Sequence, residues 1–457
     1  MDLLSLYRSL AVNPPAMIAF SGAGGKTTLI MRLATEMNSA GLKTLLTTTT
    51  KFYPPPGIKL FLSHDPELAV SLLGEHFLNN QAAALGKRVL PDGKIEGIEP
   101  DVIAFLLHEL RVSILVEADG AKGLPIKGYA AHEPVIPPDT DIIIALLGAD
   151  ALGAPLDHKI AHRPKLLSEQ INIAEGTLLT EKNLADAYKN ILSFSLTQAP
   201  FAQTVCALNK VDLLNHPASV ALAIADHLSV ETGVVPESLL FVEGQHSAAV
   251  KIALTRHNNT LSAAVSCILL AAGTSSRMGI DKLTLDYKGK TIIEHSLDNI
   301  LSAGFEDIVV VTRPNSGLVK LIKAAKVRVI ENKQYKSGLA SSLIAGLKEI
   351  DARAQGVVFA LADQPLVTPI IYRQLIETYQ KSLKMVVGPI CKGQRGNPTL
   401  FDRRAWPFVM ELSGDEGGRK IIAKLPPAEI FLLETDLNGV LFDVDTPEAY
   451  QKLLHEH

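Results

Sequence analysis

An apolar run that passes directly into a glycine-rich loop occurs twice in this sequence, at Met17–Gly25 and again at Cys267–Gly273. A helix-like stretch follows each loop, and short apolar runs alternate with helix-like stretches along the whole chain. This alternation is typical of βα units, which assemble into parallel sheets. Because 457 residues are more than one hydrophobic core usually holds, the two starts predict two α/β domains.

The boundary between these domains is predicted at the polar stretch 255–260, Thr-Arg-His-Asn-Asn-Thr. The second apolar run with its glycine loop begins soon afterwards, as expected where a new nucleotide-binding domain starts. We therefore expect an N-terminal domain over residues 1–258 and a C-terminal domain over residues 259–457. A further division of the first half near residue 160 remains an alternative.

The composition excludes several classes of protein. A net charge of −4 with 20% charged residues gives no basic surface for nucleic acid or for an anionic membrane. The cysteines Cys206, Cys267 and Cys391 are far apart and form no CxxC pair, so neither a zinc site nor a disulfide framework is expected. Residues 1–15 lack the basic and apolar regions of a signal peptide, and the run Ile142–Leu147 is too short to cross a bilayer. We therefore expect a cytoplasmic protein.

The second glycine loop carries residue types that bind phosphate. Within Cys267–Gly279 an apolar strand runs into small and hydroxylated residues, and Gly273 permits close approach of a ligand to the backbone. Successive N–H groups of such a loop can hold phosphate oxygens. Arg277 and Lys282 would then neutralise the charge of the phosphates. The alternative is a tight βα turn with an Arg and a Lys on the surface.

Acidic residues in two later segments could hold a divalent metal ion. The apolar run Val357–Leu361 leads to Asp363, at the carboxyl edge of the predicted sheet, where ligands of parallel sheets bind. Asp443 and Asp445 are two residues apart, so they share one face of an extended segment. Mg2+ is commonly bound by one or two carboxylates together with substrate phosphates. Each acid could instead cap a helix or lie in a turn.

Six blocks of the second half, in this order and spacing, resemble the molybdenum cofactor cytidylyltransferase family, often called MocA. The first block alone would fit any sugar-nucleotide transferase, whereas the six together are specific. The resemblance extends over nearly the whole second half and implies a Rossmann-like, GT-A-like three-layer α/β/α fold. The blocks are Leu270–Gly279 with Lys282, Ser337–Leu347, Ala362–Pro365, Arg395–Pro398, Leu412–Arg419 and Asp443–Pro447.

The resemblance implies transfer of CMP from CTP to the terminal phosphate of molybdopterin, with release of pyrophosphate and with Mg2+ (or Mn2+) as the metal. The related guanylyltransferases usually carry Leu-Ala-Gly-Gly in the first block, whereas this sequence has Ala272 at the third position. Ala272 therefore favours CTP over GTP. The alternatives are a transferase that uses GTP and one whose acceptor is a sugar or polyol phosphate. The blocks Arg395–Pro398 and Leu412–Arg419 argue against a sugar acceptor.

The resemblance also implies roles for individual residues. Arg277 and Lys282 would stabilise the leaving pyrophosphate, and Asp363 and Asp445 would hold the metal, with Asp443 as a weaker candidate. No general base is needed, because the attacking phosphate is already ionised. The residues implied on the nucleotide side are Leu270, Ala271, Ala272, Gly273, Thr274, Ser275, Ser341 and Ser342. Those implied on the pterin side are Arg395, Gly396, Asn397, Pro398, Asp415, Glu416, Gly418 and Arg419, of which the last four could instead form a polar surface turn.

The glycine loop of the first half ends like a Walker A sequence. Gly25-Lys26-Thr27 matches the end of GxxxxGK[ST], but Phe20 stands where the first glycine would be, so the match is partial. Backbone N–H groups of the small residues would surround a phosphate, Lys26 would reach the β- and γ-phosphates, and Thr27 would bind Mg2+. A glycine-rich turn without a ligand is the alternative. The predicted nucleotide-binding residues are Gly22, Ala23, Gly24, Gly25, Lys26, Thr27 and Thr28.

Two further segments of the first half support a nucleotide site. Ile114–Gly120 is an apolar run that ends in acids, as a Walker B segment does, so Glu117 or Asp119 could hold Mg2+ through water. Asn209-Lys210-Val-Asp212 follows the apolar run Thr204–Leu208 and matches NKxD, which reads guanine in GTP-binding proteins. The Asp212 carboxylate would accept two hydrogen bonds from the base. NKxD also arises by chance.

Four blocks of the first half, Gly22–Thr28, Thr47–Phe52, Val116–Lys127 and His162-Arg-Pro, resemble the YqeC family, a selenium-dependent hydroxylase accessory group. Together with the glycine loop, the resemblance implies a P-loop NTPase-like domain with a parallel sheet. It also implies NTP-dependent help in maturing a molybdenum hydroxylase, at the step of selenium insertion, with the apo molybdenum hydroxylase as a partner. The alternative is a non-catalytic, nucleotide-switched carrier or chaperone.

Overall fold

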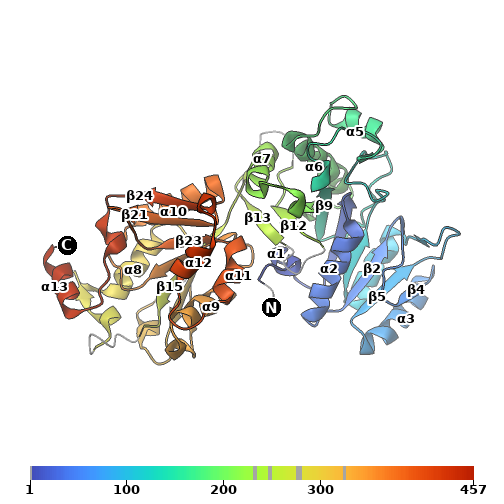
Figure 1. Ribbon diagram of the computed structural model, residues 1–457. Coiled ribbons are helices and arrows are strands. Elements are labelled where there is room, and N and C mark those ends of the chain that lie inside the picture. The colour runs from blue at the N-terminus through green and yellow to red at the C-terminus, as the bar shows by residue number, and fades with distance from the viewer. Residues whose placement is uncertain (1–2, 230–233, 245–249, 274–279, 323–325, 457) are drawn as a thin grey trace. The chain divides into compact units, whose positions relative to one another are not determined.

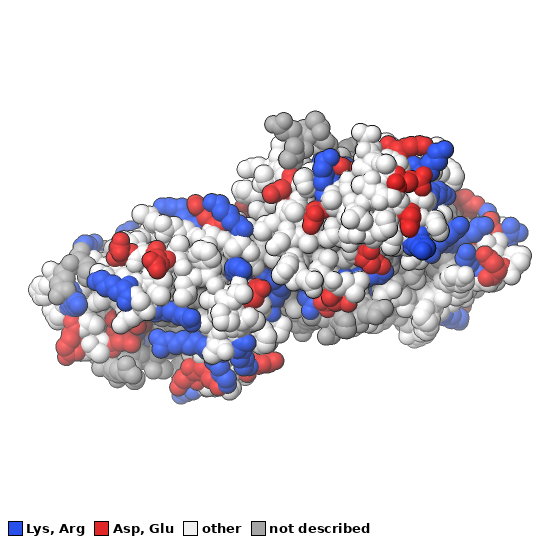
Figure 2. Space-filling view, turned by 45° about the horizontal axis from the view of Figure 1, so that its top comes forward, with Lys and Arg blue, Asp and Glu red and all other residues white. Residues whose placement is uncertain are grey.

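The structure is a computed structural model of the chain and describes residues 3–229, 234–244, 250–273, 280–322 and 326–456. The chain folds into two compact units, Met1–Ser262 and Ala263–His457. Figure 1 shows that each unit consists of a sheet with helices packed on it. On the face drawn in Figure 2, acidic and basic side chains are interspersed.

A ten-stranded sheet forms the centre of the N-terminal unit. Its strands are β1 (Met17–Gly22), β2 (Thr44–Thr48), β4 (Leu60–Leu62), β5 (Ala82–Gly86), β7 (Ser113–Glu117), β9 (Ile142–Gly148), β11 (Gln203–Asn209), β12 (Ser238–Val242), β13 (Val250–His257) and β14 (Thr260–Ser262). They lie in the order β14-β13-β12-β11-β9-β1-β7-β2-β5-β4. Neighbours from β12 to β4 are parallel, whereas β13 and β14 pair antiparallel. Because β1 lies within the parallel part, the glycine loop after it opens at the carboxyl edge, where ligands bind.

The helix that follows the glycine loop is fixed to the sheet by its apolar face. The helices of this unit are α1 (Leu6–Ser9), α2 (Lys26–Ser39), α3 (Pro66–Asn79), α4 (Pro100–Leu110), α5 (Pro164–Gln170), α6 (Glu181–Leu196) and α7 (Pro217–Ser229). In α2, Leu29, Leu33 and Met37 recur at every fourth position, so they lie on one face and are buried. They belong to the same core cluster as Ile18 and Phe20 of β1. The start of α2 is therefore held against the sheet.

Two short strand pairs are formed by segments that are far from the glycine loop in the sequence. β3 (Lys51–Phe52) pairs antiparallel with β6 (Ile95–Glu96). β8 (Ile126–Lys127) pairs parallel with β10 (Ala161–His162). β3 contributes Lys51 and Phe52 to the wall of a cavity over the glycine loop, and β8 contributes Lys127 to ion pairs with Asp119 and Glu133.

The C-terminal unit contains a mixed sheet of eight strands. They are β15 (Val265–Ala271), β18 (Asp307–Thr312), β19 (Val327–Glu331), β20 (Gly356–Leu361), β21 (Val386–Cys391), β22 (Gln394–Arg395), β23 (Thr399–Asp402) and β24 (Ile430–Glu434). The order is β19-β18-β15-β20-β23-β21-β22, and β24 pairs with β21. β15, β18, β19 and β20 are parallel, whereas β23 runs antiparallel to β20 and β21. β15 is again followed by the glycine loop at the carboxyl edge.

A glycine lets α9 approach the sheet of this unit closely. The helices are α8 (Ile292–Leu301), α9 (Leu339–Glu349), α10 (Pro369–Ser382), α11 (Trp406–Met410), α12 (Gly418–Lys424) and α13 (Pro447–Glu456). A Cβ atom at Gly346 of α9 would lie 2.6 Å from Ile268 Cγ2 and 3.0 Å from Val311 Cγ2. Thr291 and Glu294 form a capping box at the start of α8, which satisfies backbone N–H groups there.

The predicted α/β fold class with parallel sheets is confirmed. The apolar run at the start of Met17–Gly25 and the apolar run Thr204–Leu208 correspond to β1 and β11. The antiparallel strands β13, β14 and β23 were not expected, because an apolar run does not encode the direction of a strand. Among the helices in the described ranges, none combines the length and apolarity needed to cross a membrane.

Candidate functional site

The glycine loop of the N-terminal unit can be built only with glycine at its key positions. Gly22, Gly24 and Gly25 have φ values of +107°, +83° and +114°. A Cβ atom at Gly22 would lie 2.1 Å from the carbonyl oxygen of Leu146, and one at Gly24 would lie 2.2 Å from the backbone N of Gly148. The loop is therefore pressed against the end of β9.

Hydrogen bonds within the protein already use part of the loop's backbone. The N–H groups of Ala23 and Gly24 donate to carbonyl oxygens of neighbouring segments at 2.8 and 2.9 Å. The Gly22 N–H donates to the carboxylate of Asp119 at 2.9 Å. The N–H groups available to a phosphate are thus those from Gly25 onward, where the first turn of α2 has no intrahelical partners for them.

Lys26 is buried and paired with Asp119. Its Nζ lies 2.9 Å from Asp119 Oδ1, and the two side chains are 3% and 0% exposed. Asp119 also accepts a hydrogen bond from the Ser21 hydroxyl at 2.9 Å. Burial acts to raise the pKa of Asp119, but the ammonium groups of Lys26 and Lys127 lower it overall. The lysine expected to reach nucleotide phosphates is therefore held by a counter-ion at the base of the loop.

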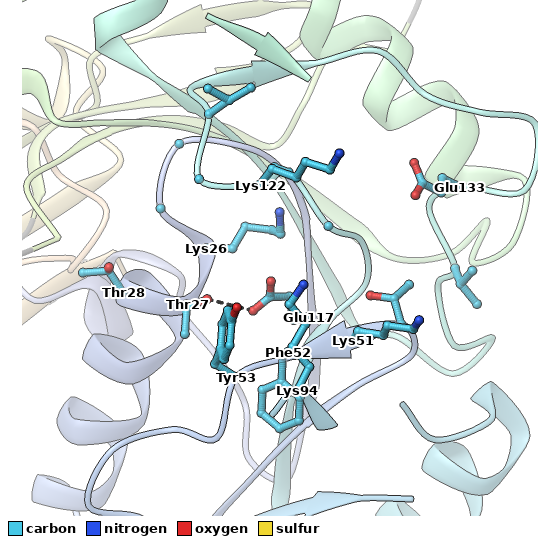
Figure 3. A pocket seen from close by; sticks show the side chains of 18 of the residues that line it. Lys26, Thr27, Thr28, Lys51, Phe52, Tyr53, Lys94, Glu117, Lys122 and Glu133 are labelled. Atoms are coloured by element: carbon cyan, nitrogen blue, oxygen red, sulfur yellow. Dashed lines mark hydrogen bonds between the residues drawn. The ribbon is translucent and has the colours of Figure 1, made fainter. Parts of the chain in front are cut away.

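Thr27 and Glu117 lie side by side in the cavity over this loop (Figure 3). The Thr27 hydroxyl donates to Glu117 Oε2 at 3.0 Å. Burial raises the pKa of Glu117, and the charge of Asp119 adds to this, whereas Lys26 acts to lower it. A hydroxyl and a carboxylate oxygen side by side are ligands of the type Mg2+ takes. Thr27 and Glu117 therefore fit a Mg2+ ion, whereas Asp119 is committed to Lys26 and lies outside the cavity lining.

The NKxD segment has a structural connection to the glycine loop. Asn209 Nδ2 donates to the carbonyl oxygen of Gly24 at 2.9 Å, and Asn209 Oδ1 accepts from the Gly244 N–H at 3.0 Å. Lys210 pairs with the acidic side chain that follows β9, at 2.6 Å. Asp212 is exposed. Of the described residues that line the cavity, none comes from this segment.

The cavity over the glycine loop has a volume of about 860 Å³. Its wall contains three lysines that we did not single out from the sequence, Lys51, Lys94 and Lys122. Lys51 and Lys122 fall inside the blocks that resemble the YqeC family, which is the signal that could have identified them. Lys94 lies in no such block. The cavity thus joins the predicted phosphate loop to a basic wall.

In the C-terminal unit, Lys282 lies between two predicted metal ligands. Its Nζ contacts Asp445 Oδ1 at 2.5 Å and also donates to Asp363 Oδ2. Burial acts to lower the pKa of Lys282, but the two carboxylates raise it overall. Asp363 follows β20, and Lys282 begins a short 3-10 helix after the glycine loop. The fold therefore brings together three predicted residues that are far apart in the sequence.

Asp443 has a different partner, the side-chain amide of Gln364, which donates to it. Burial raises the pKa of Asp443, and the charges of Asp363 and Asp445 add to this. In the part of the chain that the structure describes, no cluster of three or more His, Cys, Asp or Glu residues could hold a metal ion by itself. Asp363 and Asp445 converge on one cation, the Lys282 ammonium. These two therefore fit a Mg2+ ion that takes its other ligands from phosphates and water.

A cavity of about 300 Å³ opens at the end of β15. The predicted residues Leu270–Gly273 line it together with Lys282, Asp363 and Ser342. Ser342 is only 5% exposed. The predicted residues Thr274, Ser275 and Arg277 lie outside the described residues.

Two polar side chains that the sequence did not indicate support this cavity. Arg313 donates to the Gly273 carbonyl oxygen at 2.6 Å and pairs with Asp281 at 2.5 Å. Asn332 Nδ2 donates to the hydroxyl oxygens of Ser341 and Ser342 at 2.8 and 3.0 Å. Ser341 does not line the cavity, although its neighbour does. No motif marks Arg313 or Asn332, because their roles depend on distances that only the fold sets.

A second cavity of about 680 Å³ adjoins the first. Both are lined by Leu270, Leu339, Leu361 and Asp415, so they share a wall. Pro398, in a cis peptide bond after Asn397, is not among the lining residues. The predicted pterin-side residues that line this cavity are Arg395, Gly396, Asn397, Asp415, Glu416, Gly418 and Arg419.

Comparison with known proteins matches one family model to each unit. The YqeC protein family matches residues 18–165, and the MobA-like NTP transferase domain family matches residues 267–429. The uncharacterized protein YqeC of Escherichia coli is 33% identical over 163 residues, which are 34% of this chain and 59% of that protein. The chain thus spans about three fifths of the length of this relative.

Two relatives match the C-terminal unit. The purine catabolism protein PucB of Bacillus subtilis is 30% identical over 192 residues, 40% of this chain and 92% of that protein. The molybdenum cofactor cytidylyltransferase of Escherichia coli is 25% identical over 189 residues, 41% of this chain and 94% of that protein. Both resemblances inferred from sequence blocks are confirmed. The chain therefore carries a region that matches the YqeC protein family, followed by a MobA-like NTP transferase domain, and through this second domain it belongs to the MobA-like NTP transferase family.

Proposed function

We propose that the C-terminal unit, a MobA-like nucleotidyltransferase, transfers CMP from CTP to molybdopterin and releases pyrophosphate. The observation that carries this proposal is the convergence of Lys282, Asp363 and Asp445 beside the cavity at the end of β15. The adjoining cavity, lined by Arg395 and Arg419, provides space for an anionic acceptor. The two substrates would then meet at the shared wall.

The residues of the smaller cavity would act by positioning and by charge. Asp363 and Asp445 would hold Mg2+ (or Mn2+), which when bound neutralises part of the triphosphate charge. Lys282 would stabilise the pyrophosphate as it leaves. The phosphate of the acceptor is already ionised, so the chain needs only to hold it in line with the α-phosphorus. Arg313 would keep Gly273 in place for close contact with the nucleotide.

The preference for CTP rests on Ala272 in the first block. A transferase that uses GTP, or one that acts on a sugar phosphate, is the alternative. Purified protein incubated with molybdopterin, Mg2+ and either CTP or GTP should release pyrophosphate faster with CTP. Release with GTP alone would shift the assignment to a guanylyltransferase, and a lack of release with every pterin acceptor would remove the proposal.

For the N-terminal unit we propose binding and hydrolysis of a nucleoside triphosphate, in support of the maturation of a molybdenum hydroxylase. The pair Thr27–Glu117, next to Lys26 in a large cavity, supports this proposal. The apo hydroxylase would be the partner, and selenium insertion would be the step assisted. A nucleotide-switched carrier without hydrolysis is the alternative, and single-turnover hydrolysis on the purified chain separates the two.

Recognition of guanine by Asp212 is a separate part of this proposal. Asp212 is exposed and thus accessible to a base, and the Asn209 side chain connects this segment to the glycine loop. Asp212→Asn should then weaken the binding of GTP about tenfold relative to that of ATP, because two charge-assisted hydrogen bonds to the base would be lost. An unchanged ratio of the two dissociation constants would remove guanine recognition but leave nucleotide binding intact.

A further inference from the structure

The lysines that line the cavity over the first glycine loop, and Lys127 behind it, differ in how their charge is compensated. Lys26 is paired with Asp119, and Lys127 is paired with Glu133 at 2.9 Å. Within the described ranges, Lys51 has no acidic side chain as a partner. Lys94 has only an exposed aspartate at 3.5 Å. Lys26 and Lys127 are therefore neutralised by buried or half-buried carboxylates, whereas the charges of Lys51 and Lys94 are left more available to a ligand.

Of the three wall lysines, Lys122 is drawn next to Lys26 (Figure 3), whereas Lys51 and Lys94 come from a strand pair outside the phosphate loop. Figure 3 shows Thr28 on one side of Glu117 and Lys51 on the other, the side of Glu133. Lys51 belongs to β3, and Lys94 directly precedes β6, so one small strand pair carries both. The Lys94 ammonium also lies 5.4 Å from the ring centroid of Tyr53, which is 61% exposed. In addition to the Thr27–Glu117 pair, the wall therefore offers two cations and one aromatic ring.

The size of the cavity allows for more than a triphosphate. Its volume of about 860 Å³ lies toward the upper end of small-molecule sites, which range over roughly 300–1,000 Å³. The phosphates of a nucleotide on the glycine loop would be served by Lys26, Thr27 and the start of α2. That leaves the space between Glu117 and Lys51 for another molecule.

We infer that Lys51, Lys94 and Tyr53 form a second substrate subsite, for a small molecule that carries a phosphate or a carboxylate group. The subsite lies beside the position of the terminal phosphate of the nucleotide. It rests on the proposed nucleotide binding by the N-terminal unit, and it makes that unit a two-substrate site instead of a simple hydrolase. Lysine ammonium groups bind either anion as point charges, so the charge alone does not choose between them.

The test uses the full chain saturated with a non-hydrolysable triphosphate analogue and Mg2+, titrated calorimetrically with phosphonoacetate, which carries a phosphonate and a carboxylate. Inorganic phosphate and malonate form separate arms that distinguish the two groups. The variant Lys51→Ala/Lys94→Ala should bind phosphonoacetate at least about tenfold more weakly, because charge-assisted contacts are lost. Its affinity for the analogue should change less than about threefold, the range of weak exposed charge effects. Lys43→Ala, an exposed lysine outside the cavity, is the matched control and should behave as wild type.

Other outcomes overturn the inference. If phosphonoacetate, phosphate and malonate all fail to bind the nucleotide-loaded wild type, there is no second subsite. If Lys51→Ala/Lys94→Ala weakens binding of the triphosphate analogue as much as binding of phosphonoacetate, the two lysines bind the nucleotide itself. If the analogue does not bind wild type at all, nucleotide binding fails as a separate proposal. Phosphonoacetate titrated into free protein then decides: loss in Lys51→Ala/Lys94→Ala but not in Thr28→Ala, an exposed residue at the glycine loop, supports the subsite, and any other pattern removes it.

Discussion

Each unit places one lysine at its glycine loop, and the two lysines are held in different ways. Lys26 is paired with Asp119, which is fully buried behind the loop. Lys282 lies between Asp363 and Asp445, whose side chains are 19% and 47% exposed. Lys26 is therefore held in place by a buried ion pair beneath the glycine loop. Lys282 instead occupies a point at which two accessible carboxylates converge, where a divalent cation could replace it.

The difference shows that similar sequence signals can serve different physical roles. A buried ion pair is costly to break, because removal of one partner leaves an uncompensated charge. Lys282 and Asp363 are largely buried too, but the side chain of Asp445 is 47% exposed, so this site can exchange the ammonium for another cation without leaving a fully buried charge unpaired. We therefore expect changes at the first lysine site to affect folding, and changes at the second to affect metal binding and catalysis.

The largest expected effect is that of Asp363→Ala. It should lower nucleotidyl transfer about a thousandfold, since it removes a ligand of the ion that stabilises the charge of the reacting phosphates. Nucleotide hydrolysis by the N-terminal unit should be unchanged. Pyrophosphate and phosphate release from the same sample measure both activities. Asp436→Ala, an exposed acid, is the control, and loss of both activities would mean that the two units form one site.

Next in size is the effect of Asp119→Asn on stability. The change leaves Lys26 buried without its counter-ion, so the N-terminal unit should lose about 3 kcal/mol of unfolding free energy. Trp406 is the only tryptophan of the sequence and lies in the C-terminal unit. Far-ultraviolet circular dichroism should therefore show an earlier transition, while tryptophan fluorescence should not shift. Asp92→Asn, at an exposed position, should change neither signal; equal behaviour of the two variants would contradict the role of Asp119.

Lys282→Ala should affect catalysis and metal binding in opposite directions. Transfer should fall about a hundredfold, because the leaving pyrophosphate loses a cation. Binding of Mn2+ without nucleotide should become tighter, since the ammonium no longer competes for Asp363 and Asp445. Electron paramagnetic resonance of free Mn2+ measures the second effect. Lys381→Ala, an exposed lysine of the same unit, should leave both unchanged, and weaker Mn2+ binding in Lys282→Ala would contradict the exchange.

The smallest effect is expected for Glu117→Gln. The pKa of Glu117 is raised above its ordinary value of 4.5 in the folded protein, chiefly by burial. Between pH 4.5 and the raised pKa of the folded state, Glu117 is more protonated in the folded protein than in the unfolded chain. Its contribution to the free energy of unfolding therefore increases as the pH falls through the folded pKa toward 4.5. The variant cannot ionise, so it should be slightly more stable at pH 7 and lack this pH dependence. Thermal unfolding of wild type and Glu117→Gln, followed by circular dichroism from pH 4.5 to 8, measures this difference. Identical pH dependence of the two proteins would contradict a raised pKa of Glu117.

Much of the site follows from local sequence. The glycines of the first loop, Lys26 and Thr27 lie in one short segment, and a strand followed by a glycine loop fixes their placement. Asp363 was predictable because the carboxyl edge of a parallel sheet faces ligands. In these cases the chemistry depends on residues close in sequence or on one general rule of topology.

Other parts of the site depend on distances set only by folding. Arg313 follows β18 and reaches Gly273 after β15, because these strands are neighbours in the sheet. Asn332 reaches Ser342 in the same way, from the end of β19 to α9. The direction of β23 was also not predictable, since apolar runs form parallel and antiparallel strands alike. Side chains that support a site from a neighbouring element carry no local pattern.

Asn209 joins three segments, namely the end of β11, the glycine loop at Gly24 and the backbone at Gly244. Asn209 is 4% exposed, and its side-chain amide uses both a donor and its acceptor in these contacts. The entropy lost in ordering these segments is therefore incurred when the chain folds and not when a ligand arrives. A loop that is already ordered before the ligand binds can retain more of its interaction energy as affinity. A change in the backbone position at Gly244 would reach the phosphate loop through the side chain of Asn209.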